Sequence, residues 1–472
     1  MNNNTQEYID FLKSKIYIAP ETGFDISPDS VSPKLKPHQR DAVRWAIRGG
    51  RRALFEAFGL GKTLQQLEWM RLILDRIGGK GLIVLPLGVM QEFKRDAVNL
   101  LEMDEPEYVR TMAEVRNAAG RILLTNYERV RDGDIDPTYF TATSLDEASV
   151  LRSFGSKTYQ TFLDKFRGVP YKLVCTATPS PNRYKELIHY AGYLEVMDTG
   201  QALTRFFQRD STKANNLTLY PHKEEEFWLW VSTWALFITK PSDLGYDDTG
   251  YDLPPLEVRY HELPVDHANA GAEQDGQLLM IRDAAVGLKD AAREKRESIK
   301  ARVAKAKEIV ESDPDAHFIL WHDLEDERHA LKEAIPDVVD IYGSQDLEIR
   351  EQRVMDFADG KIRLFATKKE LSGSGCNFQR HCHRAIFVGI DYQFNDFIQA
   401  IHRIYRFLQD KPVIIDIIYT ESERQILEEL QRKWRQHDYL VSKMIEIIRK
   451  YGLSGTSVID KLARTIGVER VK

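Results

Sequence analysis

The sequence is poor in cysteine and has no long hydrophobic segment. Its 472 residues include three cysteines, Cys175, Cys376 and Cys382, none of them in a Cys-x-x-Cys pair, which argues against a disulfide framework or a cysteine-based zinc site. No stretch approaches the ~18 apolar residues that cross a bilayer. The N-terminal MNNNTQEYIDF lacks the basic-then-apolar order of a secretory signal. We therefore expect a cytoplasmic protein without a membrane segment.

An excess of positive charge is also missing. The formal net charge is −6, so the chain as a whole does not attract nucleic acid, and any such binding has to come from local patches. We find no internal repeat, no low-complexity tract and no metal-nuclease constellation. The composition, with 43% hydrophobic and 29% charged residues, is typical of a globular protein with a core.

Short apolar runs alternate with helical patterns along most of the chain. Continuous apolar runs, as opposed to alternating ones, favour strands buried on both faces, and hence parallel sheets joined by crossover helices. In the first half the runs are residues 53–55, 82–85, 122–125 and 172–176, and in the second half residues 318–321, 362–366, 385–390 and 413–419. Because the pattern occurs twice, it predicts two α/β domains in tandem.

The composition of the segments between these runs predicts the domain boundaries. An aromatic-rich helical stretch at 224–237 precedes the turn-rich KPSDLGYDDTGYDLPP, which is typical of a boundary. We expect an N-terminal extension (1–30), a first α/β domain (31–200), a helical insertion or linker (201–256), a second α/β domain (257–420) and a helical, locally basic C-terminal tail (421–472).

Residues 56–63, EAFGLGKT, lie between an apolar run and a helical pattern. Strand, glycine-rich loop and helix form the context that a phosphate-binding loop requires. Gly59 and Gly61 would let backbone N–H groups turn toward phosphates, Lys62 would reach the β- and γ-phosphates, and Thr63 would bind Mg²⁺. A plain glycine turn between core elements is the alternative. The pattern predicts binding of ATP or GTP.

An acidic pair, Asp146-Glu147, follows a β-compatible stretch in LDEAS. A phosphate-loop hydrolase needs one carboxylate to hold Mg²⁺ and another to polarise the attacking water, and we assign these roles to Asp146 and Glu147 respectively. Such a pair on its own is usually solvated surface. Its position between the glycine-rich loop and CTATP at 175–179 favours the catalytic interpretation.

LGKT, DEAS and TATP, in this order, resemble motifs I, II and III of superfamily 2 helicases. GLGKT is similar to the Swi/Snf-type branch, although Ser149 stands where that branch has histidine in motif II. TATPSPNRYKEL and KPSDLGY look closest to compact helicases carried by phages and prophages. The resemblance covers about residues 31–420. It implies two RecA-like domains, ATP and Mg²⁺ as cofactors, and nucleic-acid-stimulated ATP hydrolysis.

The resemblance also implies further site residues. Gln39, in LKPHQ, would read the adenine, and Gly375, in the motif V-like SGSGCNFQ, would approach the ATP. The residues expected to touch the nucleic-acid backbone come from the segments PLGVM, TNYE and TATP. They are Pro86, Thr125, Asn126, Thr176 and Thr178.

QAIHRIYRFLQ at 399–409 resembles the family pattern QAxxRxxRxGQ of motif VI. At 3.6 residues per turn, Gln399, Arg403 and Arg406 would share one helix face. Two guanidinium groups that point to the same place are suited to bind a γ-phosphate. The alternative interpretation of this segment is a surface helix with ordinary salt bridges. Leu408 replaces the family's glycine and is expected at the end of this helix.

These motifs together predict an ATP-driven motor, lacking a nuclease of its own, that moves along or remodels DNA, with double-stranded DNA favoured. A strand-separating helicase, an RNA-directed helicase and an ATP-gated clamp without motor activity remain alternatives. Protein partners could bind residues 201–256 or the tail. The tail's basic residues, Arg432, Lys433, Arg435 and Lys443, fit either a contact to DNA or a partner, or a solvated helix face.

Overall fold

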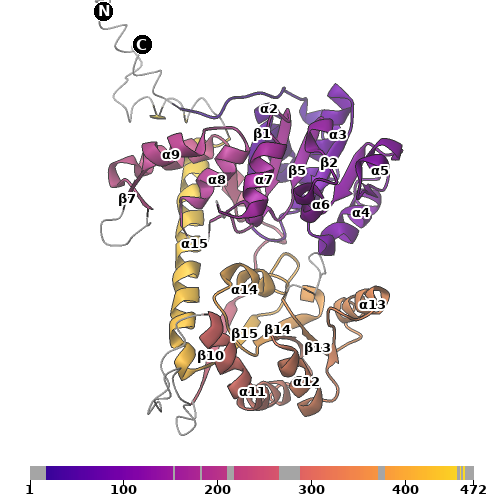
Figure 1. The fold of residues 1–472 in the computed structure, drawn as a ribbon, viewed down its shortest axis with the longest axis vertical. Coiled ribbons are helices and arrows are strands. Elements are labelled where there is room, and N and C mark those ends of the chain that lie inside the picture. The colour runs from indigo at the N-terminus through magenta and orange to yellow at the C-terminus, as the bar shows by residue number, and fades with distance from the viewer. Residues whose placement is uncertain are drawn as a thin grey trace, which may run out of the picture. The chain divides into compact units, whose positions relative to one another are not determined.

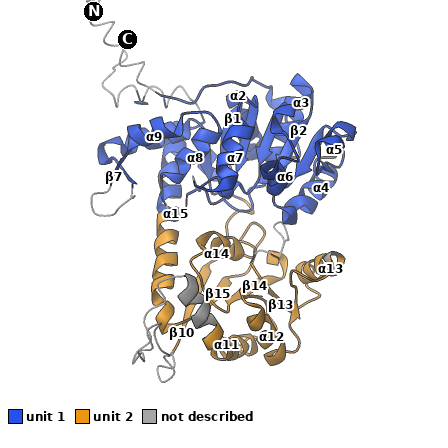
Figure 2. Ribbon diagram, in the orientation of Figure 1, with its two compact units in different colours: residues 1–248, 437–472 blue, residues 249–436 orange. Residues whose placement is uncertain are grey.

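The computed structural model describes residues 17–152, 155–180, 183–209, 217–264, 288–369, 371, 378–453, 458 and 461–462. It divides into two compact units (Figure 2). Unit 1 comprises residues 1–248 and 437–472, and unit 2 comprises residues 249–436. Among the described residues, no helix is long and apolar enough to cross a membrane.

Unit 1 is built on a seven-stranded sheet in the order β3-β4-β2-β5-β6-β1-β9, and all of its strand pairs are parallel. Strands β1, β2 and β5 of this sheet are labelled in Figure 1. The strands are β1 (Arg51–Glu56), β2 (Gly81–Val84), β3 (Glu107–Tyr108), β4 (Ile122–Thr125), β5 (Ala142–Leu145), β6 (Tyr171–Cys175) and β9 (Ala235–Ile238). Every residue of β2, β5, β6 and β9 is buried. Such burial on both faces is what a parallel sheet flanked by helices produces.

In unit 1, helix α2 (Pro37–Gly49) precedes β1 in the chain. Between the strands lie α3 (Lys62–Ile77), α4 (Met90–Asn99), α5 (Met112–Asn117), α6 (Tyr127–Asp132), α7 (Lys157–Lys165), α8 (Glu186–Tyr193), α9 (Thr199–Phe206) and α10 (Glu224–Ser232). A small antiparallel hairpin pairs β7 (Phe207–Arg209) with β8 (Leu217–Leu219). The long helix α15 (Arg424–Tyr451) contains the point at which the chain passes from unit 2 back to unit 1.

Unit 2 contains a six-stranded parallel sheet in the order β10-β15-β14-β11-β13-β12. The strands are β10 (Leu256–Leu263), β11 (His317–Trp321), β12 (Val339–Asp340), β13 (Leu364–Thr367), β14 (Cys382–Phe387) and β15 (Val413–Thr420). The helices are α11 (Leu288–Glu311), α12 (Glu325–Ala334), α13 (Leu347–Ala358) and α14 (Phe394–Ile401).

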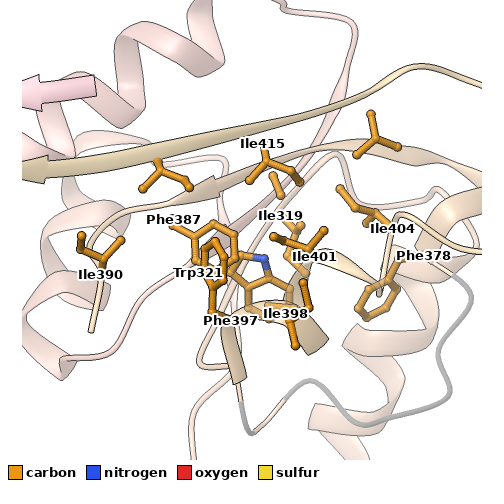
Figure 3. Close-up of a cluster of buried hydrophobic side chains, with 14 of the residues drawn as sticks. Ile319, Trp321, Phe378, Phe387, Ile390, Phe397, Ile398, Ile401, Ile404 and Ile415 are labelled. Carbon is orange, nitrogen blue, oxygen red and sulfur yellow. The ribbon is translucent and has the colours of Figure 1, made fainter. Parts of the chain in front are cut away.

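The core of unit 2 forms where α14 packs on its sheet (Figure 3). Phe397 and Ile401 of the helix lie against Ile319 and Phe387 of the central strands, and all four side chains are buried. Buried apolar side chains of this kind hold the helix, and therefore the residues that follow it, in a defined position on the sheet.

The structure confirms the predicted fold class of two α/β domains with parallel sheets flanked by helices and a helical C-terminal region. The segment 201–256, expected to be helical, contains α9 and α10 but also three strands. Among them, β9 pairs with β1 and forms the edge of the unit 1 sheet. The reason is that residues 235–238, ALFI, are a short and fully buried apolar run of the same kind as the other strands.

Candidate nucleotide-binding site

The glycine-rich loop of unit 1 connects β1, which ends at Glu56, to α3, which begins at Lys62. Gly59 and Gly61 have φ of +85° and +82°, in the left-handed region that residues with a Cβ rarely adopt. At Gly61 a Cβ would in addition lie 2.3 Å from Nε2 of Gln39. The strand, the glycine turn and the helix that a phosphate-binding loop needs are therefore all present at residues 56–63.

Lys62 folds back over this loop. Its Nζ donates hydrogen bonds to the carbonyl oxygens of Glu56 at 2.8 Å and Ala57 at 3.1 Å. Thr63 follows it in the first turn of α3, where the backbone N–H groups and the helix dipole favour an anion. The ammonium and the helix N-terminus thus place positive charge on the same short loop.

Gln39 belongs to α2 and contacts the loop directly. Its side chain is buried, its Nε2 donates to the carbonyl of Leu60 at 2.8 Å, and its Oε1 accepts from the backbone N–H of Lys36 at 2.8 Å. Although 21 residues separate Gln39 from Leu60, the fold places them together. Recognition of adenine by Gln39 stays a prediction.

Asp146 and Glu147 directly follow β5, which is separated from β1 by the single strand β6. The carboxyl ends of parallel strands meet at one edge of a sheet, so the acidic pair and the glycine-rich loop lie at the same edge. The backbone N–H of Asp146 donates to Val84 of the neighbouring strand at 2.8 Å. Glu147 has φ of +48°, a conformation that costs a residue with a Cβ about 1–3 kcal/mol and is found most often at functional sites.

Two residues of the site that the sequence did not reveal orient the Asp146 carboxylate. Gln66 of α3 donates from Nε2 to Asp146 Oδ1 at 2.8 Å, and its Oε1 accepts from the hydroxyl of Ser144 at 2.7 Å. The only signals in the sequence are a glutamine one turn after Lys62 and a serine in a buried strand. Because Gln66 and Ser144 satisfy each other, the amide is fixed and holds one carboxylate oxygen in place.

The electrostatics of the pair suit a divalent cation. Burial and the adjacent Glu147 carboxylate raise the pKa of Asp146 above its usual range, while the Gln66 hydrogen bond and the Lys62 ammonium act in the opposite direction. Bound Mg²⁺ would relieve this repulsion between the carboxylates, and oxygen ligands are those it prefers. The donor set of Asp146 with the hydroxyl of Thr63 therefore fits Mg²⁺.

A second buried carboxyl group, Glu56, lies under the loop. Its side chain is fully buried, its Oε2 accepts from Gln65 Nε2 at 2.7 Å, and burial raises its pKa to about 7. Gln65 Nε2 also donates to the carbonyl of Leu60 at 3.3 Å, the same carbonyl that accepts from Gln39. An acidic residue directly after the apolar run 53–55 was the signal for this position in the sequence.

The residues predicted to touch nucleic acid in unit 1 lie at the same sheet edge, but most are engaged within the fold. Thr125 donates from Oγ1 to Val109 at 2.8 Å, and Thr176 accepts at Oγ1 from the Thr178 N–H at 3.2 Å. Asn126 is buried, and its amide bonds to Tyr108 and Glu128. Pro86 is partly exposed. Nucleic-acid contact by these five residues stays a prediction.

The prediction that one helix carries Gln399, Arg403 and Arg406 on one face is wrong, because α14 ends at Ile401. Residues 402–408 form turns instead. Gln409 is buried and donates from Nε2 to the carbonyls of Ile404 and Cys382, each at 3.0 Å. These bonds, with the burial of Ile404, hold the segment against β14 and prevent the helix from continuing.

Both arginines are partly buried in unit 2, and Arg403 donates from Nη2 to the carbonyl of Lys369 at 3.5 Å. Leu408, expected at the end of a helix, lies in a turn with φ of +70°. This left-handed conformation accounts physically for the glycine that the family pattern has there. Gly375 lies outside the described residues.

Arg432, Lys433 and Lys443 of the C-terminal helix make contacts within the protein. Arg432 bonds through Nε to Glu429 at 2.7 Å, and Lys433 donates to the carbonyl of Tyr392 at 3.1 Å. Lys443 lies 5.7 Å from the ring centre of Tyr439. These contacts within the protein engage part of the basic charge of the helix.

Comparison with known proteins gives partial matches. No family model matches the chain. Over 230 residues it is 24% identical to the Caenorhabditis elegans chromodomain-helicase-DNA-binding protein 3 homolog, covering 40% of this chain and 12% of that protein. Over 193 residues it is 23% identical to the Arabidopsis thaliana CHD3-type chromatin-remodeling factor CHR7, covering 37% of this chain and 16% of that protein. The matches thus span less than a fifth of either relative.

Among solved structures, the chain is similar to the Sulfolobus solfataricus SWI2/SNF2 ATPase core in complex with dsDNA. The two are 18% identical, the alignment covers 94% of this chain and 99% of that one, and the TM-score is 0.41.

Proposed function

We propose that this protein is an ATP-dependent DNA translocase or helicase in which two RecA-like domains couple ATP hydrolysis to movement along DNA. The observation that carries the proposal is the convergence, at one edge of the unit 1 sheet, of the glycine-rich loop with Lys62 and the Asp146-Glu147 pair. The Gln66 hydrogen bond ties Asp146 to the helix that follows the loop. Binding alone would not need a water-activating carboxylate beside the phosphate loop.

The residues of unit 1 have separate roles in this proposal. The backbone N–H groups of residues 59–63 and the Lys62 ammonium bind the β- and γ-phosphates, and Gln39 bonds to the adenine. Thr63 and Asp146 hold Mg²⁺, which when bound neutralises charge on the phosphate oxygens. Glu147 orients the attacking water and accepts its proton.

Arg403 and Arg406 of unit 2 supply positive charge to the transition state. Arginine fingers of this kind contribute about 10³–10⁵ in rate, or roughly 4–7 kcal/mol of barrier. Their function requires the two units to close on the nucleotide, so each cycle of hydrolysis opens and closes the pair and shifts its grip on the DNA backbone. Gripping phosphates makes such movement largely independent of base sequence.

DNA is the proposed track because of the Swi/Snf-like form of motifs I, V and VI, and because the two partial sequence matches are to a helicase-DNA-binding protein and a chromatin-remodeling factor. The net charge of −6 does not favour any polyanion, so local contacts have to provide the affinity.

The deciding experiment is a steady-state ATPase assay with double-stranded DNA, single-stranded DNA, RNA and no nucleic acid in parallel. We expect the largest stimulation by double-stranded DNA. Triplex displacement and strand-separation assays on the same preparation then distinguish a translocase from an unwinding helicase. Folded Lys62→Ala protein is the control and should show no turnover. Stimulation by RNA alone would favour an RNA-directed helicase, and ATP-dependent DNA binding without turnover in the wild type would favour a clamp.

A further inference from the structure

Three loops at the carboxyl ends of neighbouring strands in unit 2 meet at one buried cation. Strands β14, β11 and β13 are adjacent in the sheet. Asp391 follows β14, Asp323 follows β11 and Lys369 follows β13. The Lys369 Nζ lies 3.0 Å from Asp323 Oδ1 and 3.0 Å from Asp391 Oδ2. We call these three residues the Lys369 cluster.

Lys369 is buried and the two aspartates are largely shielded from solvent, so the three charges act strongly on one another. The exposed fractions of the side chains are 3% for Lys369, 20% for Asp323 and 15% for Asp391. Burial disfavours the charged ammonium, but the two carboxylates outweigh this effect and raise the pKa of Lys369 above its ordinary value. A cation held between two carboxylates in a low-dielectric site fixes the positions of all three.

Two paths of contact lead from the cluster to the segment that carries the arginines. The Lys369 carbonyl accepts from Arg403 Nη2 at 3.5 Å. Asp391 Oδ1 accepts from the backbone N–H of Gln393 at 2.8 Å, directly before α14 begins. The cluster therefore anchors both the start of α14 and the guanidinium group just beyond its end.

We propose that Lys369, held by Asp323 and Asp391, is a positioning residue that sets the Arg403 guanidinium for ATP hydrolysis. This inference rests on the proposed ATPase function and assigns to the cluster a role in the orientation of Arg403. Lys369 itself touches neither phosphate nor metal in this proposal. Its substitution therefore acts on the rate of the chemical step and leaves nucleotide binding in place.

The test is a double-mutant cycle on the full-length protein with wild type, Lys369→Met, Arg403→Ala and the doubly substituted chain. DNA-stimulated kcat is measured under saturating ATP and by single turnover, with ATP affinity from fluorescent-nucleotide titration. We expect Lys369→Met to lower kcat by about 100-fold, since a displacement of about 1 Å has this effect on catalytic geometry. ATP affinity should stay within about threefold, and Lys369→Arg, which keeps the charge, should recover most of kcat.

The decisive readout is non-additivity. If Lys369 acts through Arg403, then Lys369→Met should change kcat by less than about threefold in the Arg403→Ala background. An equal loss in both backgrounds would overturn the proposal, because Lys369 would then act independently of Arg403. If Lys369→Met does not fold, the pair Lys369→Met with Asp391→Asn leaves less uncompensated buried charge and is measured in its place.

Unit 2 contains a matched control. Arg384 is also a buried cation between two carboxylates, with Nη1 at 2.6 Å from Asp313 and Nη2 at 3.3 Å from Asp416. It lies in the first half of β14, away from the carboxyl end of the strand. Arg384→Met should lower the urea midpoint about as much as Lys369→Met but leave kcat of the folded fraction near wild type. Equal loss of kcat in both variants would show that stability alone explains the effect.

The experiments distinguish a failure of the proposed role of Lys369 from a failure of the proposed function. A wild type without nucleic-acid-stimulated turnover would contradict the proposed function itself. Wild-type turnover that is abolished by Lys62→Ala but unaffected by Lys369→Met would leave the proposed function standing and overturn only the role of Lys369.

Discussion

Gln66 and Asp146 are 80 residues apart in the chain, yet their side chains are joined by a 2.8 Å hydrogen bond from Nε2 to Oδ1. Gln66 lies one turn beyond Lys62 on α3, and Asp146 directly follows β5. The bond therefore connects the two halves of the candidate site, the phosphate loop and the acidic pair. Ser144 fixes the other end of the amide, so the glutamine cannot turn away without leaving a buried hydroxyl unsatisfied.

We expect Gln66→Ala to weaken Mg²⁺ binding by about 10–100-fold, the usual effect of losing a residue that orients a metal ligand. The measurement is the Mg²⁺ dependence of ADP binding by calorimetry, together with the Mg²⁺ dependence of ATP hydrolysis. Thr204 of α9 is a suitable control, because its hydroxyl is exposed and donates to the carbonyl of Gly200 in the same helix. Mg²⁺ affinity that is unchanged in Gln66→Ala would show that Asp146 does not need the glutamine, or is not the ligand.

Glu147→Gln should trap ATP. The substitution removes the proton acceptor, whereas Asp146 and Lys62 remain to hold metal and phosphate, so nucleotide and DNA should bind tightly while hydrolysis becomes slow. Rapid filtration of bound radiolabelled ATP, alongside single-turnover hydrolysis, measures both effects. Normal hydrolysis by this variant would mean that the segment 145–149 is not the acidic motif. Glu333→Gln, at an exposed position of α12 in unit 2, can serve as a comparison of charge loss alone.

The buried carboxyl of Glu56 makes stability depend on pH. Its pKa is raised by burial to about 7 in the folded protein, against an ordinary value of 4.5. The folded state therefore binds more protons than the unfolded state between these values, and its stability falls as pH rises from about 4.5 through about 7, by at most about 1.4 kcal/mol per pH unit. Glu56→Gln should remove this contribution.

The measurement for Glu56 is the free energy of unfolding of wild type and Glu56→Gln by urea between pH 5 and 8, taken as a difference so that other titrating groups cancel. The wild type should lose stability relative to the variant across this interval. A difference that is independent of pH would show that Glu56 keeps an ordinary pKa in the folded protein.

Leu408→Gly should stabilise the protein. Leu408 has φ of +70° and a side chain that is 52% exposed, so it has backbone strain but little burial to lose. Relief of a left-handed conformation is worth about 1–2 kcal/mol, reduced by the greater entropy of glycine in the unfolded chain to a net gain of about 0.5–1 kcal/mol. Leu408→Ala keeps the strain and removes the same exposed side chain. A urea midpoint for glycine no higher than that for alanine would contradict this account.

Several features of this protein follow from the sequence alone because their physical causes are local. Apolar runs of three to seven residues between helical patterns predict buried parallel strands, and β1, β2, β4 and β6 lie where these runs are. Gly59 and Gly61 mark a turn that requires positive φ, and both have it. The acidic pair at 146–147 also directly follows a strand, as its position in the chain predicts.

Other features depend on contacts between distant residues, and only the tertiary structure decided them. The periodicity around Arg403 and Arg406 is helical, but Gln409 and Ile404 bind to β14 and its surroundings, and this packing ends α14 at Ile401. In the same way, β9 joins the sheet because β1 offers an unpaired edge. The partners of Asp146 and Lys369 lie in other loops and helices, and a buried charge takes its position from whichever neighbours can neutralise it. Local pattern therefore determined the elements and the candidate site, while long-range packing and buried polar pairing determined where the elements end and which side chains meet.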